Sequence, residues 1–262
     1  MKRLLKHEFF KVLNSLTIKV LLFVVAGLAL LNSLSIVLLR NYLTGMLDDG
    51  NGIINGAFQG SQGMAAAFSD INNLATIMAI AIVVLTTHEY NTGSIKNTLL
   101  SDQARITIYI AKYIVTITVV TVFAIVNAIF YCSVNLIAFG WGGAFSFQSL
   151  WSNYILIMLL GLLLCYSLAA MVSFVAYSTK NTVLTIVTVF GVGVILTIFS
   201  IFESVGMGFF SWINQFSYTT VLMTYYLSKS STDLLYYFVT VAMLFIPFFI
   251  GGLLVFKKQE IK

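Results

Sequence analysis

The sequence predicts an all-α membrane protein, a single transmembrane domain over residues 1–262 with six membrane-spanning helices. Of the 262 residues, 60% are hydrophobic and only 9% are charged, whereas an ordinary soluble domain is about 25% charged. The chain also contains a single proline, which favours long uninterrupted helices. A folded chain with so little polar surface needs hydrocarbon around it.

Each membrane-spanning helix is predicted from an apolar run. An α-helix needs about 20 apolar residues to cross roughly 30 Å of hydrocarbon. The runs that meet or approach this length lie at residues 18–39, 71–87, 113–139, 150–177, 182–202 and 234–256. The first run follows a basic segment, as in a signal peptide, but it is long and no small-residue cleavage site follows it. We therefore expect it to be a retained span.

Residues 1–17 precede the first span and are predicted to form an amphipathic helix at the membrane interface. When residues are placed about 100° apart, apolar side chains gather on one face and basic side chains on the other. Lys2, Glu8 and Phe10 depart from this pattern. We expect the helix to lie in the inner headgroup layer, and the residues expected to contact lipid are Arg3, Lys6, Phe9 and Lys11. A frayed cytoplasmic tail is the alternative.

The basic residues also predict the orientation. Of the 14 Lys and Arg residues, only Arg40 and Lys229 lie on the opposite side of the predicted spans from the termini. Because cytoplasmic segments carry the excess of Lys and Arg, both termini and the connection 88–112 are predicted to be cytoplasmic. The segments expected to face outward are 40–70, 140–149 and 203–233. The expected location is the plasma membrane of a bacterium.

Residue types that carry chemistry are missing from the predicted spans. No Asp, Glu, Lys, Arg or His lies near the middle of a span, which disfavours a proton- or sodium-coupled carrier. The sequence has no phosphate-binding loop, so the chain is not expected to be an enzyme. Its two cysteines and two histidines show no ligand spacing, so no metal site and no cofactor are expected in this chain. Scattered basic residues argue against a nucleic-acid partner.

The polar connection 88–112 is predicted to contain a short amphipathic helix. Gly93 can end the preceding helix with a positive φ, and Ser94 can cap the next one. Ile95 and Leu99 are then i, i+4 neighbours on one face. A single solvated turn is the alternative, which periodicity leaves open.

This connection carries the motif Glu-Tyr-x-x-Gly-Ser-Ile-Lys at residues 89–96, followed by Asn-Thr-Leu-Leu-Ser. With its place after the second of six spans, the motif resembles that of the permease subunits of ABC type-2 transporters, although Ser94 stands where threonine is commoner. The resemblance implies that the connection is a coupling helix seated in a separate ATPase subunit. The residues implied to contact that subunit are Glu89, Tyr90, Gly93, Ser94, Ile95, Lys96, Leu99 and Arg105.

The resemblance further implies how such a chain works. ATP and Mg²⁺ are bound by the ATPase partner, and a second permease chain completes a homodimer or a heterodimer in the lipid bilayer. The outward segment 203–233 is implied to form two short helices that dip toward the membrane, and an interfacial anchor is the alternative. The glycine-rich segment 40–70 is expected to be a flexible linker, and a helix that packs closely against a neighbour through the small residues at 52, 56 and 60 is the alternative.

The function expected from these observations is that of a permease subunit in an ATP-driven exporter. Spans lined by Ser, Thr and Asn suit a hydrophobic or amphipathic cargo, and a membrane-active, antimicrobial peptide is the leading expectation. Drugs, polysaccharides and sodium are the other cargoes within the range of the family. A membrane scaffold or sensor that transports nothing is the competing class.

Overall fold

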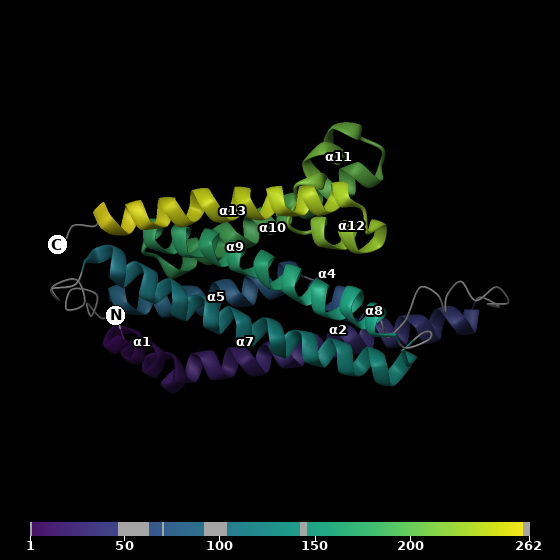
Figure 1. Ribbon diagram of the computed structural model, residues 1–262, viewed down its shortest axis with the longest axis horizontal. Helices are drawn as coiled ribbons and strands as arrows, with labels where there is room; N and C mark the ends of the chain where they lie inside the picture. Colours follow the sequence, from purple (N-terminus) through teal and green to yellow (C-terminus); the bar gives the residue numbers. More distant parts are fainter. Residues whose placement is uncertain (1, 47–62, 70, 92–103, 142–145, 259–262) are drawn as a thin grey trace.

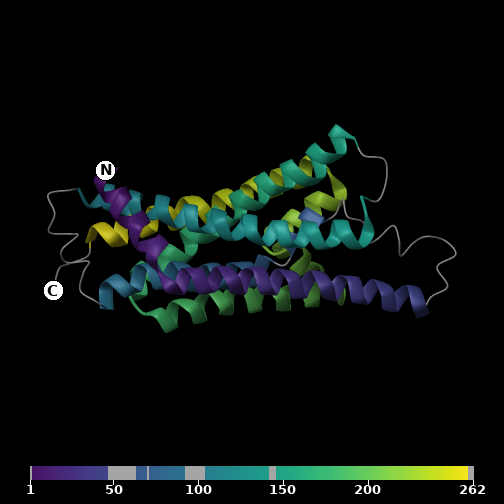
Figure 2. The same cartoon turned by 90° about the horizontal axis from the view of Figure 1, so that it is seen from below.

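The computed structural model describes residues 2–46, 63–69, 71–91, 104–141 and 146–258, and every regular element in these ranges is helical. The elements are α1 (Lys2–Asn14), α2 (Leu16–Met46), α4 (Gly63–Ser69), α5 (Ile71–Asn91), α7 (Arg105–Phe139), α8 (Phe147–Leu150), the π-helix η2 (Trp151–Ile155), α9 (Leu156–Thr179), α10 (Thr182–Ser204), α11 (Gly208–Gln215), α12 (Val221–Ser228) and α13 (Ser231–Lys258). Figures 1 and 2 show an elongated bundle in which the start of α1 and the end of α13 lie at the same end. The predicted all-α class is confirmed.

Five helices are long and apolar enough to cross a membrane, which supports a multi-pass membrane protein. They cover Leu16–Tyr42, Arg105–Phe139, Trp151–Thr179, Thr182–Ser204 and Ser231–Lys258. The predicted span 71–87 falls within α5, whose apolar stretch, Asn73–Thr87, is shorter than the other five. A sixth crossing therefore stays a prediction. A single residue separates the end of α4 from the start of α5 in the chain.

The helix α5 lies in the centre of the bundle. The four helices α2, α7, α9 and α10 all contact it, and Ala75, Ala79 and Ala81 are among its buried residues. Such small side chains let neighbouring helices approach closely. By contrast, only 11% of the 18 most apolar consecutive residues of α10 are buried inside the bundle, and the share in α13 is the same. The short apolar helix is thus enclosed by longer helices that turn apolar side chains outward, as contact with hydrocarbon requires.

The helix α4 corrects one expectation from the sequence. Residues 40–70 were expected to be a flexible outward loop, but α4 is a buried helix that contacts α7, α9 and α12. Met64, Ala65 and Phe68 are buried, and the side-chain amide of Asn127 in α7 donates a 2.8 Å hydrogen bond to the carbonyl oxygen of Ala67. This bond satisfies a carbonyl near the end of α4 that has no partner within the helix. Residues 47–62 lie outside the described residues.

The contact between α4 and α9 supports a stability prediction. A Cβ atom at Gly161 would lie 2.7 Å from the ring of Phe68, so an alanine there forces the ring to move. We expect Gly161→Ala to reduce the free energy of unfolding by about 1–3 kcal/mol, the usual cost of overpacking a core. Thermal unfolding in detergent measures this, with Gly191→Ala as the control, because a Cβ there meets no atom within 4 Å. Equal losses in the two variants would contradict the prediction.

The far end of the bundle, opposite the end of α13, carries two short helices. The segment 203–233 forms α11 and α12, joined by a turn that contains Ser217 and Tyr218. Figure 1 places both helices at this far end. Burial raises the pKa of Tyr218 to about 12. The pair of short helices implied by the resemblance is present, and its role in sealing a pathway stays a prediction.

Candidate functional site

The end of the bundle that carries both chain termini is here called the terminal end. It consists of α1, the last turns of α5, α9 and α13, and the first turns of α7 and α10 (Figures 1 and 2). The connection predicted to dock a partner joins α5 to α7 at this end. The residues around its two attachment points therefore determine what a docked partner could move.

An aromatic cluster contributed by three of these helices contacts two more. The ring of Tyr109 in α7 lies 5.7 Å from the ring of Tyr177 in α9 and 5.8 Å from that of Phe256 in α13. Tyr90, in the last turn of α5, packs against the cluster, and so does Leu4 of α1. The hydroxyl of Tyr109 donates a 3.2 Å hydrogen bond to the carbonyl oxygen of Phe249. Tilted aromatic pairs at these distances add to the stability gained by burial alone, so the cluster holds the helix ends together.

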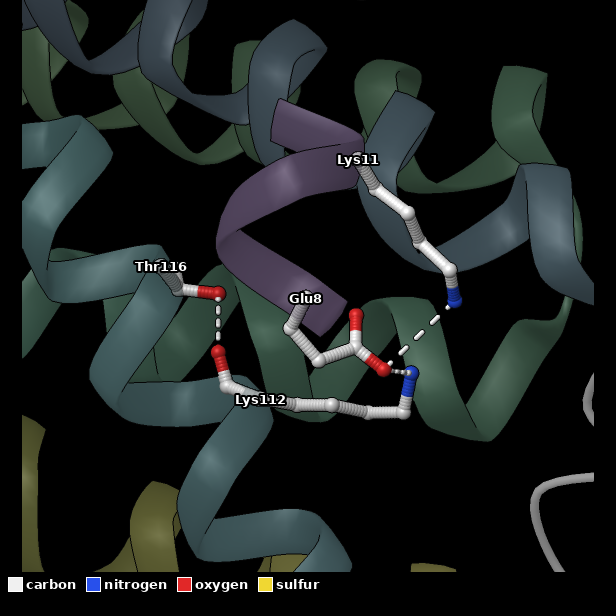
Figure 3. A network of polar contacts seen from close by, with 4 residues as sticks. All are labelled: Glu8, Lys11, Lys112 and Thr116. Atoms are coloured by element: carbon white, nitrogen blue, oxygen red, sulfur yellow. Dashed lines mark hydrogen bonds and ion pairs between the residues drawn. The ribbon is translucent and has the colours of Figure 1, made fainter. Parts of the chain in front are cut away.

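A buried ion pair attaches α1 to α7. The ammonium of Lys112 lies 3.3 Å from a carboxylate oxygen of Glu8, and that of Lys11 lies 3.5 Å from the same oxygen (Figure 3). Glu8 is 6% exposed and Lys112 is 8% exposed. The hydroxyl of Thr116, one turn further along α7, donates a 3.0 Å hydrogen bond to the carbonyl oxygen of Lys112. Both charges are therefore compensated inside the protein rather than by water.

Two further polar contacts link helix ends across the terminal end. The guanidinium of Arg105 donates a 2.8 Å hydrogen bond to the carbonyl oxygen of Lys257 in the last turn of α13. This cation satisfies a carbonyl at a helix C-terminus, where the helix dipole favours positive charge. In addition, the hydroxyl oxygens of Thr87 in α5 and Thr182 in α10 lie 2.9 Å apart. The end of the central helix is thus coupled directly to the start of α10.

The structure describes only part of the predicted docking motif. Gly93, Ser94, Ile95, Lys96 and Leu99 lie outside the described residues. Glu89 and Tyr90 belong to the last turn of α5, and Arg105 is the first residue of α7. Tyr90 is half-buried, and the ammonium of Lys180 lies 5.8 Å from the centre of its ring. The two attachment points of the connection are therefore fixed to the bundle by Tyr90 and Arg105.

The predicted interfacial helix is present as α1, although its place in the headgroup layer stays a prediction. Arg3 belongs to its first turn, Lys6 is exposed, and Phe9 and Lys11 are half-buried. The contact between α1 and α7 and the ion pair of Glu8 with Lys112 were not anticipated from the sequence. The one sequence signal was the position of Glu8 near the apolar side of α1, which requires a partner charge when that side is buried.

The polar groups described at this end form ion pairs and hydrogen bonds between helices. Among the described residues, no group of three or more His, Cys, Asp and Glu side chains could hold a metal ion. No family model matches the chain, and no curated protein matches its sequence. The likeness to ABC type-2 permeases therefore depends on the motif at 89–96 and on the order of the helices.

Proposed function

We propose that this chain is the membrane-spanning permease subunit of an ATP-driven exporter, and that its terminal end receives the ATPase subunit. The observation that carries the proposal is the connection 92–103, which carries most of the docking motif and joins α5 to α7. The helix ends on both sides of it are bonded to α10 and α13 through Thr87 and Arg105. A partner seated on the connection would therefore act on the whole terminal end.

The coupling step follows from these contacts. Closure of two ATPase subunits around ATP and Mg²⁺ would displace the connection and, with it, the end of α5. Because α5 lies in the centre of the bundle and contacts α2, α7, α9 and α10, its displacement changes several helix interfaces at once. A ligand shifts a protein between two arrangements only if it binds one more tightly than the other. Here ATP is that ligand, and it binds through the ATPase subunits. In this proposal the Glu8–Lys112 pair keeps α1 attached to α7 during that movement.

The positions of the charges in the long helices favour ATP hydrolysed by a partner over an ion gradient as the energy source. Lys19, Arg40, Lys112, Glu203 and Asp233 all lie toward the ends of their helices. Ion-driven carriers place ionisable groups near the middle of the membrane. The apolar spans suit a hydrophobic or amphipathic cargo, for which a membrane-active peptide is our leading candidate.

The test is co-expression of the chain with an ABC ATPase subunit encoded beside its gene. We expect the two subunits to co-purify in detergent, and ATP hydrolysis by the complex in lipid nanodiscs to exceed that of the ATPase alone. Cells that express both subunits should survive membrane-active peptides at concentrations that kill cells lacking the pair. If the ATPase co-purifies but hydrolysis and survival do not change, the chain is a scaffold or sensor. If no ATPase is retained, the proposal fails.

A further inference from the structure

A cavity of about 370 Å³ lies between α5 and α10 in the half of the bundle nearer the far end. Its walls come from the first turns of α5, from the stretch of α10 between Val189 and Ile198, and from Tyr218 in the turn that joins α11 to α12. This volume falls within the range of about 300–1,000 Å³ typical of small-molecule sites. Because the connection 92–103 belongs to the terminal end, what this cavity binds is a question distinct from the docking of an ATPase.

Tyr218 brings an unpartnered hydrogen-bonding group to the cavity. The residue is only 4% exposed, yet its hydroxyl forms no hydrogen bond with any residue in the described part of the chain. The hydroxyl is also not among the polar atoms that protein atoms enclose completely. A buried tyrosine hydroxyl normally finds a partner, and it can donate as well as accept. Since Tyr218 lines the cavity, a molecule bound there can supply that partner.

The other polar groups in the walls are uncharged. Asn73 and Thr76 of α5 and Thr197 of α10 line the cavity, and the hydroxyl of Thr197 donates a 2.9 Å hydrogen bond to the carbonyl oxygen of Gly193. No charged side chain from the described residues is part of the lining. An ionised ligand would lose its hydration here without meeting an opposite charge, so the walls favour an uncharged molecule.

The remaining wall is apolar and opens toward hydrocarbon. Phe190, Val194 and Ile198 follow one another at intervals of four residues along α10, so they share one face of the helix. All three line the cavity and are exposed on the surface of the bundle. Tyr218 and Asn73 lie on the side of the far end, whereas Phe190 lies on the side of the terminal end. A molecule with a polar end and an apolar chain would contact both kinds of wall.

We infer that this cavity binds an uncharged glycerolipid from the leaflet around the far end, and that Tyr218 donates a hydrogen bond to an ester carbonyl of the lipid. The acyl chain follows Val194 and Phe190 along α10 toward the middle of the membrane. The bound lipid contacts α5, α10 and the turn between α11 and α12 and fills the space between them. This inference is independent of the transport function proposed above, because it needs neither an ATPase nor a cargo.

The test measures lipid binding by native mass spectrometry on the full chain in a non-ionic detergent. Monoolein, an uncharged glycerol ester, is the probe. Oleyl glyceryl ether, which has the same chain and the same hydroxyls but no carbonyl, is the comparison. We expect one monoolein to bind about fivefold more tightly than the ether, the effect of one neutral hydrogen bond. Tyr218→Phe should lower the affinity for monoolein to that for the ether and leave the affinity for the ether unchanged.

Tyr225→Phe is the matched control, because Tyr225 is also buried, lies in the neighbouring helix α12 and is not among the cavity-lining residues. Val194→Trp places a larger side chain at the exposed rim and should weaken the binding of both lipids, which tests the site independently of Tyr218. Equal affinity of the original chain for the two lipids would overturn the inference. So would equal weakening of monoolein binding by Tyr218→Phe and Tyr225→Phe, or unchanged binding to the Val194→Trp chain. Tighter binding of oleate than of monoolein would show an anion site and would also contradict the inference.

Discussion

The Lys112→Ala variant is expected to lose about 3 kcal/mol of unfolding free energy. Removal of this ammonium leaves the buried carboxylate of Glu8 with Lys11, at 3.5 Å, as the other ion-pair partner that the described residues provide. Breaking a buried pair by deleting one partner costs about 3–5 kcal/mol, and the contact with Lys11 places the expected loss at the lower end. Thermal and chemical unfolding of the purified chain in detergent measure this loss. For a chain of ordinary marginal stability such a loss is large.

Two controls separate the ion pair from the loss of a long side chain. The double variant Glu8→Leu with Lys112→Met removes both charges and keeps apolar volume, so it should recover most of the stability lost by Lys112→Ala. Lys19→Ala removes an exposed lysine from α2 and should change stability by less than about 0.5 kcal/mol. A Lys112→Ala variant as stable as the original chain would show that the pair does not hold α1 against α7.

The second large effect is expected at the docking motif. Ile95→Asp combined with Leu99→Asp should reduce the affinity of the chain for its ATPase subunit by at least about 100-fold, because two buried apolar anchors contribute roughly 1.5–3 kcal/mol each. Coupled ATP hydrolysis should fall to the rate of the ATPase alone. Affinity is measured by titration of the ATPase subunit onto the chain in nanodiscs, and hydrolysis by phosphate release.

The matched control for that variant adds the same two charges at the same spacing. Asn97 and Ser101 are also i, i+4 neighbours, and they lie on the opposite face from Ile95 and Leu99 in a helix with 100° per residue. Asn97→Asp with Ser101→Asp should therefore leave binding within about threefold of the original value. If both double variants lose binding equally, charge rather than an apolar face explains the loss, and the coupling-helix proposal fails.

The long helices could be predicted from sequence because composition alone determines them. An uncharged apolar run forms a helix in hydrocarbon whatever its neighbours are, and each of the five long apolar helices contains one of the predicted runs. Their ends were less well predicted. The first predicted span ended at residue 39, whereas α2 continues to Met46. Polar residues at helix ends make hydropathy a poor guide to where a helix ends.

The buried helix α4 could not be predicted because its burial depends on distant parts of the chain. Its sequence, Gly-Met-Ala-Ala-Ala-Phe-Ser, follows a glycine-rich stretch and resembles a linker. Small residues are buried only when other helices approach them, and here α7 and α9 supply those contacts.

In the candidate site, too, the contiguous motif could be predicted from the sequence, whereas the contact between distant residues could not. The motif at 89–96 is local, so the sequence alone located the connection. The Glu8–Lys112 pair joins residues 104 positions apart, and a single sequence gives no means of matching two such charges. Glu8 did stand out on the helical wheel, but the identity of its partner had to come from the structure.

The short apolar stretch of α5 has a consequence for how the protein is made. During synthesis a helix enters the bilayer alone only when its own apolar length suffices, which is about 20 residues. The apolar stretch Asn73–Thr87 falls short of this, and it carries Asn73 and Thr76 near its start. Its contacts with α2 and α7, the long helices before and after it in the chain, provide what its own sequence lacks. The newborn chain is therefore expected to keep α5 at the insertion machinery until α7 has emerged, so that the central helix is inserted together with its neighbours.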